Sequence, residues 1–130
     1  MKRKKLLLRL CMLIGILLFG PTSAWADDSG TCGDYLTWTY SNGTLTISGT
    51  GPMDDYSASD TPWYYLSDGK GTELINKVVF EEGVTTIGAY AFDYCKGLTT
   101  VEMSTTITTI GKVAFSYCPN LTTINFKGNI

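Results

Sequence analysis

Apolar positions recur with a period of 23 residues along the second half of the chain. Residues 84–106 and 107–129 are two versions of one segment, identical at eleven of 23 aligned positions. A partial copy precedes them. The shared apolar frame is Ile75, Val78 and Phe80, then Leu98, Val101 and Met103, then Leu121, Ile124 and Phe126. A period in the twenties with this frame predicts a leucine-rich-repeat type of solenoid, in which each coil buries its apolar face against the next.

Alternation within each unit predicts a strand over 98–103 and over 121–126, with the apolar side chains pointing into the coil. Ile87 and Ile110 supply a second inward layer. The glycines that follow them are expected where the backbone bends sharply and a side chain would obstruct it. Ala91-Phe92 and Ala114-Phe115 then fall on a short helical or irregular turn. The strands are expected to form a parallel sheet on one side.

Residues 36–47 predict a β-hairpin ahead of the repeats. Apolar residues alternate with threonines on both sides of Asn42-Gly43, a pair that favours a type I′ turn. Residues 49–74 are rich in Gly, Ser, Asp and Pro and are expected to be a loop whose Pro62–Tyr65 cluster packs back. This region would cap the open edge of the first repeat strand. The predicted fold is therefore mainly β: a solenoid of 23-residue coils with parallel strands, preceded by a β-hairpin cap.

The unit T-T-I-G-x-x-A-F-x-x-C-x-x-L-T-T-I, which covers residues 75–130, resembles the repeats of BspA-type (Treponema-like) leucine-rich-repeat surface proteins. Segments 29–39, 41–51 and 61–65 resemble, more loosely, the part that precedes such repeats. The resemblance implies adhesion to host extracellular or mucosal proteins, or attachment between cells. It supplies no short catalytic or ligand-binding motif.

The first 26 residues predict a secretory signal peptide. Four basic residues at 2–5 precede an apolar stretch, and Ala24-Trp25-Ala26 is a cleavage motif. We expect a secreted, cell-surface-associated protein with a β cap and loop at 27–74 and repeats at 75–130, one partial and two full. Ile130 occupies the repeat position of Val84 and Ile107, which predicts a truncated array and self-association through the open edge at 121–126.

Charge and composition argue against several classes of partner and activity. The first 26 residues hold five of the ten basic residues and none of the twelve acidic ones, so cleavage leaves a net charge of about −7. Nucleic acid and anionic lipid are therefore poor partners. The chain has no second apolar segment that would indicate a membrane span. The chain has no histidine, the commonest general base and zinc ligand, and its carboxylates match no calcium loop. We expect no enzyme activity, metal or cofactor.

Cys95 and Cys118 occupy equivalent repeat positions, about one strand spacing apart and within reach of a disulfide. Parallel Cβ directions favour a ladder of buried thiols over a bridge, although a secreted protein permits bridges. Cys32 stays unpaired in either arrangement.

Outward positions of the repeat strands provide the candidate binding surface, since solenoids use such extended faces for recognition. The partner expected there is a host or extracellular protein. The alternatives are a carbohydrate-binding module that uses the cap aromatics at 56–65, and a structural N-terminal fragment of a larger surface protein. Buried aromatic rings would count against sugar binding. The candidate surface residues are Thr99, Thr100, Glu102, Thr122, Thr123, Asn125 and Lys127.

Overall fold

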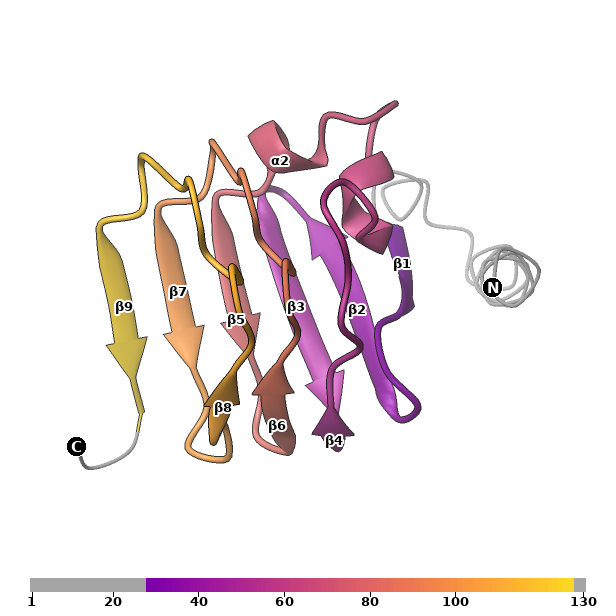
Figure 1. Cartoon of the computed structure of the whole chain (residues 1–130), viewed down its shortest axis with the longest axis vertical. Coiled ribbons are helices and arrows are strands. Elements are labelled where there is room, and N and C mark those ends of the chain that lie inside the picture. Colours follow the sequence, from indigo (N-terminus) through magenta and orange to yellow (C-terminus); the bar gives the residue numbers. More distant parts are fainter. Residues whose placement is uncertain (1–27, 128–130) are drawn as a thin grey trace.

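The computed structural model describes residues 28–127 (Figure 1). Its strands are β1 (Asp28–Thr31), β2 (Leu36–Ser41), β3 (Thr44–Gly49), β4 (Gly51–Pro52), β5 (Lys77–Phe80), β6 (Val84–Ile87), β7 (Thr100–Met103), β8 (Thr109–Ile110) and β9 (Thr123–Phe126). A 3-10 helix, η2 (Pro62–Tyr65), and a short α-helix, α2 (Gly71–Leu74), lie between β4 and β5. The predicted signal peptide at 1–26 lies outside the described residues.

The large sheet has six strands in the order β1-β2-β3-β5-β7-β9. Its first three strands pair antiparallel, and the remaining pairs are parallel. Asn42 and Gly43 join β2 to β3 with φ of 49° and 83°. Positive φ at both positions is the geometry of a type I′ hairpin turn, so the predicted hairpin cap and parallel repeat strands are confirmed.

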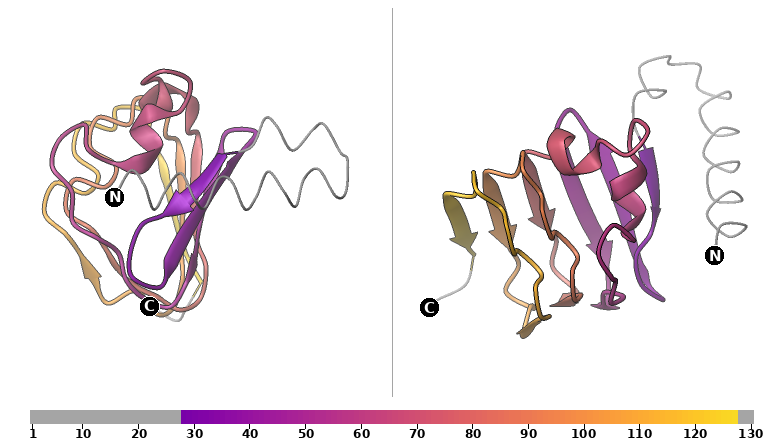
Figure 2. Two further views of the ribbon diagram at one scale, coloured as in Figure 1. Left: turned by 90° about the vertical axis from the view of Figure 1, so that its right-hand side faces the viewer. Right: turned by 45° about the horizontal axis from the view of Figure 1, so that its top comes forward.

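A second parallel sheet, β4-β6-β8, faces the large one (Figure 1). The sequence indicated a second apolar layer at Ile87 and Ile110 but not that these residues end hydrogen-bonded strands. Viewed along the stack, the two sheets and the connecting turns form three sides of one outline (Figure 2). The molecule is therefore a short β-solenoid with strands on two of its sides.

The cap also supplies the first coil of the solenoid. Residues 49–74 were expected to be a loop, but they contain β4, η2 and α2. Because β3 pairs parallel with β5 and β4 pairs parallel with β6, the second strand of the hairpin and the start of the excursion follow the path of a repeat. The expected strand starts also need correction: β7 begins at Thr100 and β9 at Thr123. Leu98 belongs to the preceding turn, where its N–H donates to Cys95 O at 3.3 Å.

A stack of aromatic rings runs through the core. Phe92 lies between Trp63 and Phe115, with ring centroids 5.1 and 5.4 Å apart and planes within about 10° of parallel. In the cap, Trp63 thus occupies the position in the ring stack that phenylalanine occupies in each repeat. Its Nε1–H donates to Ala91 O at 2.9 Å, which satisfies the polar atom of a side chain only 1% exposed. Trp63 is therefore a core residue of the cap.

Close approach of adjacent coils explains the repeated glycine. A Cβ on Gly88 would lie 1.8 Å from Asp54 O, and one on Gly111 would lie 2.5 Å from Ala89 N. Neither distance is compatible with a side chain. The prediction of a side-chain-free position is confirmed, with the neighbouring backbone as its cause.

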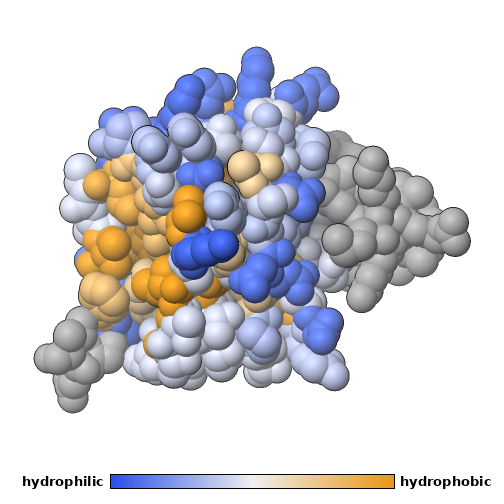
Figure 3. Space-filling view, in the orientation of Figure 1, coloured by the Kyte–Doolittle hydropathy of each residue, from blue (hydrophilic) through white to orange (hydrophobic). Residues whose placement is uncertain are grey.

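Burial decreases toward β9. Val78 and Val101 are buried, whereas the equivalent Ile124 is 41% exposed. Phe80 and Met103 are buried, whereas Phe126 is 55% exposed. Apolar surface gathers at this end of the molecule (Figure 3). The same side-chain types are thus covered or uncovered according to whether another coil follows them.

Candidate functional site

The polar face of the large sheet is built by strand alternation. Inward positions on β3, β5, β7 and β9 carry the apolar frame, so the positions between them point outward. Strand register aligns the outward residues in two rows. We call these rows the outer sheet face. The first row is Ser41, Thr44, Lys77, Thr100 and Thr123, and the second is Thr39, Thr46, Val79, Glu102 and Asn125.

Four of the seven candidate residues lie on this face: Thr100, Glu102, Thr123 and Asn125. Lys127 follows β9 and is exposed. Thr99 and Thr122 precede their strands, and each hydroxyl donates to a carbonyl oxygen one repeat earlier. Thr99 Oγ1 lies 3.1 Å from Asn76 O, and Thr122 Oγ1 lies 3.5 Å from Thr99 O. These two threonines therefore connect successive coils.

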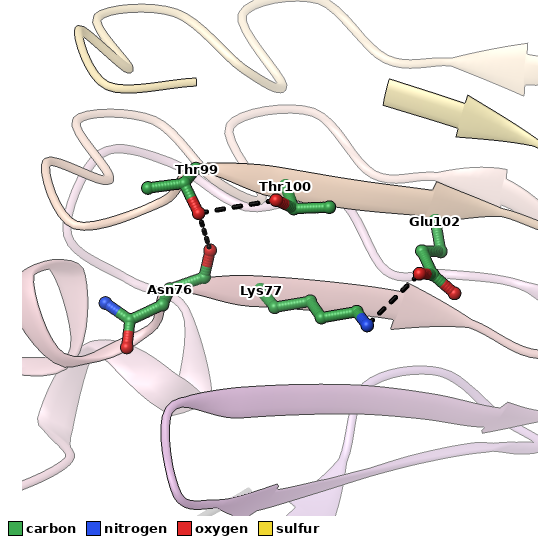
Figure 4. A network of polar contacts seen from close by, with 5 residues as sticks. All are labelled: Asn76, Lys77, Thr99, Thr100 and Glu102. Atoms are coloured by element: carbon green, nitrogen blue, oxygen red, sulfur yellow. Dashed lines mark hydrogen bonds and ion pairs between the residues drawn. The ribbon is translucent and has the colours of Figure 1, made fainter. Parts of the chain in front are cut away.

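An ion pair crosses the outer sheet face between β5 and β7 (Figure 4). Lys77 Nζ lies 3.1 Å from Glu102 Oε2, and the hydroxyls of Thr99 and Thr100 are 3.4 Å apart. Both charged side chains are partly exposed, so the pair contributes at most about 1 kcal/mol of stability. Its main effect is to hold two long side chains in place and to leave this part of the face without net charge.

The cap extends the same face beyond the repeat strands on which it was predicted. Thr39 on β2 and Thr46 on β3 align with Glu102 and Asn125 through Val79. The sequence carried a signal for this extension of the face. In the T-x-T segments at 37–39 and 44–46, the threonines flank Trp38 and Leu45, which are buried. Repeat and cap thus share one surface of hydroxyl, amide and methyl groups.

Among the described residues, two carboxyl groups have a shifted pKa, and they lie in different turns of the solenoid. Two hydrogen bonds from Thr105, one from its hydroxyl and one from its N–H, hold the pKa of Glu82 below its usual value. Burial raises the pKa of Asp93. Between residues 28 and 127 no group of three or more acidic or cysteine side chains is placed to hold a metal ion.

Cys32, Cys95 and Cys118 are free thiols, the arrangement that the sequence favoured. Burial, together with the charge of Asp54, raises the pKa of Cys32 to about 12. Burial also raises the pKa of Cys95 and of the half-buried Cys118. Cys118 donates from its Sγ to Phe92 O at 3.1 Å. The thiols are packing groups that are poorly suited to act as nucleophiles.

The alternative of a sugar platform at the cap aromatics requires an exposed Trp63, and Trp63 is buried. Its ring is buried against Phe92, and Tyr64 is half-buried. Tyr65 is exposed, with its ring edge-on to Tyr64 at a centroid distance of 5.2 Å. Burial of Trp63 counts against carbohydrate binding through the cap aromatics.

Residues 70–130 match the family model of the BspA type leucine rich repeat region (6 copies). The fold is similar to that of a leucine-rich repeat protein from Eubacterium ventriosum, with a TM-score of 0.69 and 31% sequence identity. That match covers 78% of this chain and 26% of the other, so the chain spans about a quarter of that protein's length. Curated proteins gave no match. Within 28–127, no helix has the length and apolar character needed to span a membrane.

Proposed function

Residues 70–130 of this chain belong to the BspA-type leucine-rich-repeat family, and from that premise we propose that the chain binds a protein partner through its outer sheet face. Leucine-rich repeats generally mediate protein binding and are typically not catalytic. The observation that carries the proposal is the alignment of outward side chains across β2, β3, β5, β7 and β9. A partner docking there meets a single surface rather than separate loops.

Threonine suits such a surface for physical reasons. Its branched Cβ restricts χ1, so little side-chain freedom remains to be lost on binding. Each hydroxyl donates and accepts, and each methyl group adds apolar contact. Because the strands are held by their neighbours in the sheet, the face is formed before the partner arrives. Affinity then depends on complementarity over several strands.

We further propose that this protein binding serves adhesion outside the cell. Residues 1–26 have the features of a signal peptide, and the family resemblance implies a surface protein that attaches to host extracellular or mucosal proteins. A processed chain with a net charge of about −7 is a poor ligand for nucleic acid. Intact-mass measurement of the secreted product checks the compartment: a chain beginning at Asp27 supports it, and a secreted chain that retains Met1 contradicts cleavage.

Lysine substitutions test which face binds. The chain is applied to immobilised extracellular-matrix and mucosal proteins, and binding is compared with that of Thr46→Lys and Thr123→Lys. Each substitution places a long charged side chain on the outer sheet face. We expect the dissociation constant to rise by roughly tenfold or more, about 1.4 kcal/mol.

Thr109→Lys is the matched control, because Thr109 is an exposed threonine on β8, in the small sheet. Its binding should equal that of the unchanged chain. If Thr109→Lys weakens binding as much as Thr123→Lys, the outer sheet face is not the binding site. If the unchanged chain binds no protein of the panel, adhesion to that class of protein is refuted.

A further inference from the structure

A hollow of about 230 Å³ lies between the cap excursion and the first full repeat. Its volume is below the roughly 300 Å³ at which small-molecule sites usually begin, so it is large enough for one side chain but small for a drug-sized ligand. The cap contributes Ser59, Tyr64 and Thr72, and the repeat contributes Tyr90, Asp93 and Lys96.

The two repeats differ at the positions that line this hollow. Tyr90, Asp93 and Lys96 are replaced in the next repeat by valine, serine and proline, while the intervening Ala-Phe and Tyr-Cys pairs are identical. The turn itself does not require the polar set, because both copies adopt the same backbone. Tyr90 and Val113 have φ of 59° and 60°. The polar side chains that line the hollow are therefore not required by the backbone fold that the two repeats share.

Asp93 provides the main chemical feature of the hollow. Its Oδ1 atom is buried and has no hydrogen-bond partner, a state that is uncommon for a carboxylate in a folded protein. Burial raises the pKa of this carboxyl group. Between described residues the ion pair formed is Lys77–Glu102, so Lys96 does not neutralise Asp93 although both line the hollow.

Three tyrosines accompany this carboxylate: Tyr64, Tyr90 and Tyr94. Aromatic rings attract ammonium and guanidinium groups, and a carboxylate forms strong charge-assisted hydrogen bonds with the same groups. We propose that the hollow receives the cationic side chain, lysine or arginine, of a bound protein partner. This inference rests on the proposed protein-binding function and adds to it the chemistry of one contact residue.

Amide chemical shifts of the ¹⁵N-labelled full chain test the inference with small probes. N-acetyl-lysine methylamide and N-acetyl-arginine methylamide should produce saturable shifts at Tyr64, Tyr90 and Tyr94. The norleucine derivative, which lacks the charge, should not. Asp93→Ser should weaken lysine binding by roughly tenfold or more through loss of a charge-assisted contact. Lys96→Gln should strengthen it, because a competing cation is removed.

Asp93→Ser introduces the residue found at the equivalent Ser116, so the fold should be retained, as amide shift dispersion will show. Asp34→Ser, the same substitution in an exposed turn, is the control and should leave binding unchanged. Equal shifts with norleucine, or unchanged lysine binding in Asp93→Ser, would overturn the proposal. Asp93-dependent shifts with methyl glucoside but not with lysine would overturn it in favour of a sugar site. The probes do not involve the outer sheet face, so this failure is distinct from failure of the adhesion assay.

Discussion

Cysteine shows how one residue type is placed by the repeat and then modified by its surroundings. Cys95 is buried, whereas Cys118 at the equivalent position in the last coil is only half-buried. The thiolate is the reactive form of cysteine, and burial disfavours it. The two thiols should therefore differ in reactivity although their sequence contexts are nearly identical.

Alkylation of the folded chain at pH 8 should label Cys118 faster than Cys95 and Cys32. The raised pKa of Cys32, to about 12, leaves very little thiolate at that pH. In denaturant all three should react at similar rates. Peptide mapping after timed iodoacetamide treatment measures each site. A peptide that joins Cys95 to Cys118 under non-reducing conditions would refute the free-thiol ladder, and faster labelling of Cys95 would refute its burial.

Left-handed residues mark a limit of prediction at the same scale. Tyr94 and Tyr117 have φ of 58° and 55°, and Val113 has φ of 60°. Such values are uncommon outside glycine and asparagine, and for a β-branched residue they are an outlier. Tyrosine and valine carry no sequence signal for this conformation. The 23-residue period therefore predicted where the turns lie, but the residues in them did not predict the positive φ values.

At the scale of elements, local patterns sufficed where a few residues determine the structure. Alternation identified the strands, and Asn42-Gly43 identified the hairpin. The small sheet was missed because β4 and β8 have only two residues each and form through pairing with β6 rather than through their own pattern. For the same reason the outer sheet face was predicted on the repeats alone: its continuation over the cap depends on the pairing of β3 with β5.

The aromatic stack yields a graded prediction. Phe92→Ala should lower the free energy of unfolding by about 3–5 kcal/mol, because the ring is buried between two others. Phe115→Ala should cost less, since Phe115 has a stacked neighbour on one side and is only partly buried. Trp63→Phe keeps the stack but removes the bond to Ala91 O, for a loss of about 1 kcal/mol or more.

Denaturation in urea measures all three variants. A loss below about 1 kcal/mol for Phe92→Ala would show that the ring is not a core anchor. Equal losses for Phe92→Ala and Phe115→Ala would show that both coils are equally covered, contrary to the gradient of burial. Trp63→Ala serves as the comparison for Trp63→Phe, because it removes both the ring and the bond.

At the scale of the molecule, each coil is stabilised by the one beside it. The equivalent inward positions on β5 and β7 are buried and become exposed on β9, which has no strand beyond it in the described part of the chain. The end of the stack therefore combines unpaired backbone groups with apolar side chains. Both features favour association with another strand.

We expect the chain to self-associate through this end, and adjacent residues on β9 can separate the two causes. Ile124→Lys places a charge on the inward, apolar side of the strand, and Thr123→Lys places one on the outer sheet face. If apolar surface drives association, Ile124→Lys should reduce oligomer size in light scattering and Thr123→Lys should not.

Appending one 23-residue unit with a polar last strand should also abolish association. It should raise the melting temperature by several degrees, because about 1 kcal/mol corresponds to roughly 4–8 °C in a domain of this size. A monomeric starting chain whose melting temperature does not change with the added unit would show that β9 already forms a stable end, and the expectation of self-association would then be wrong.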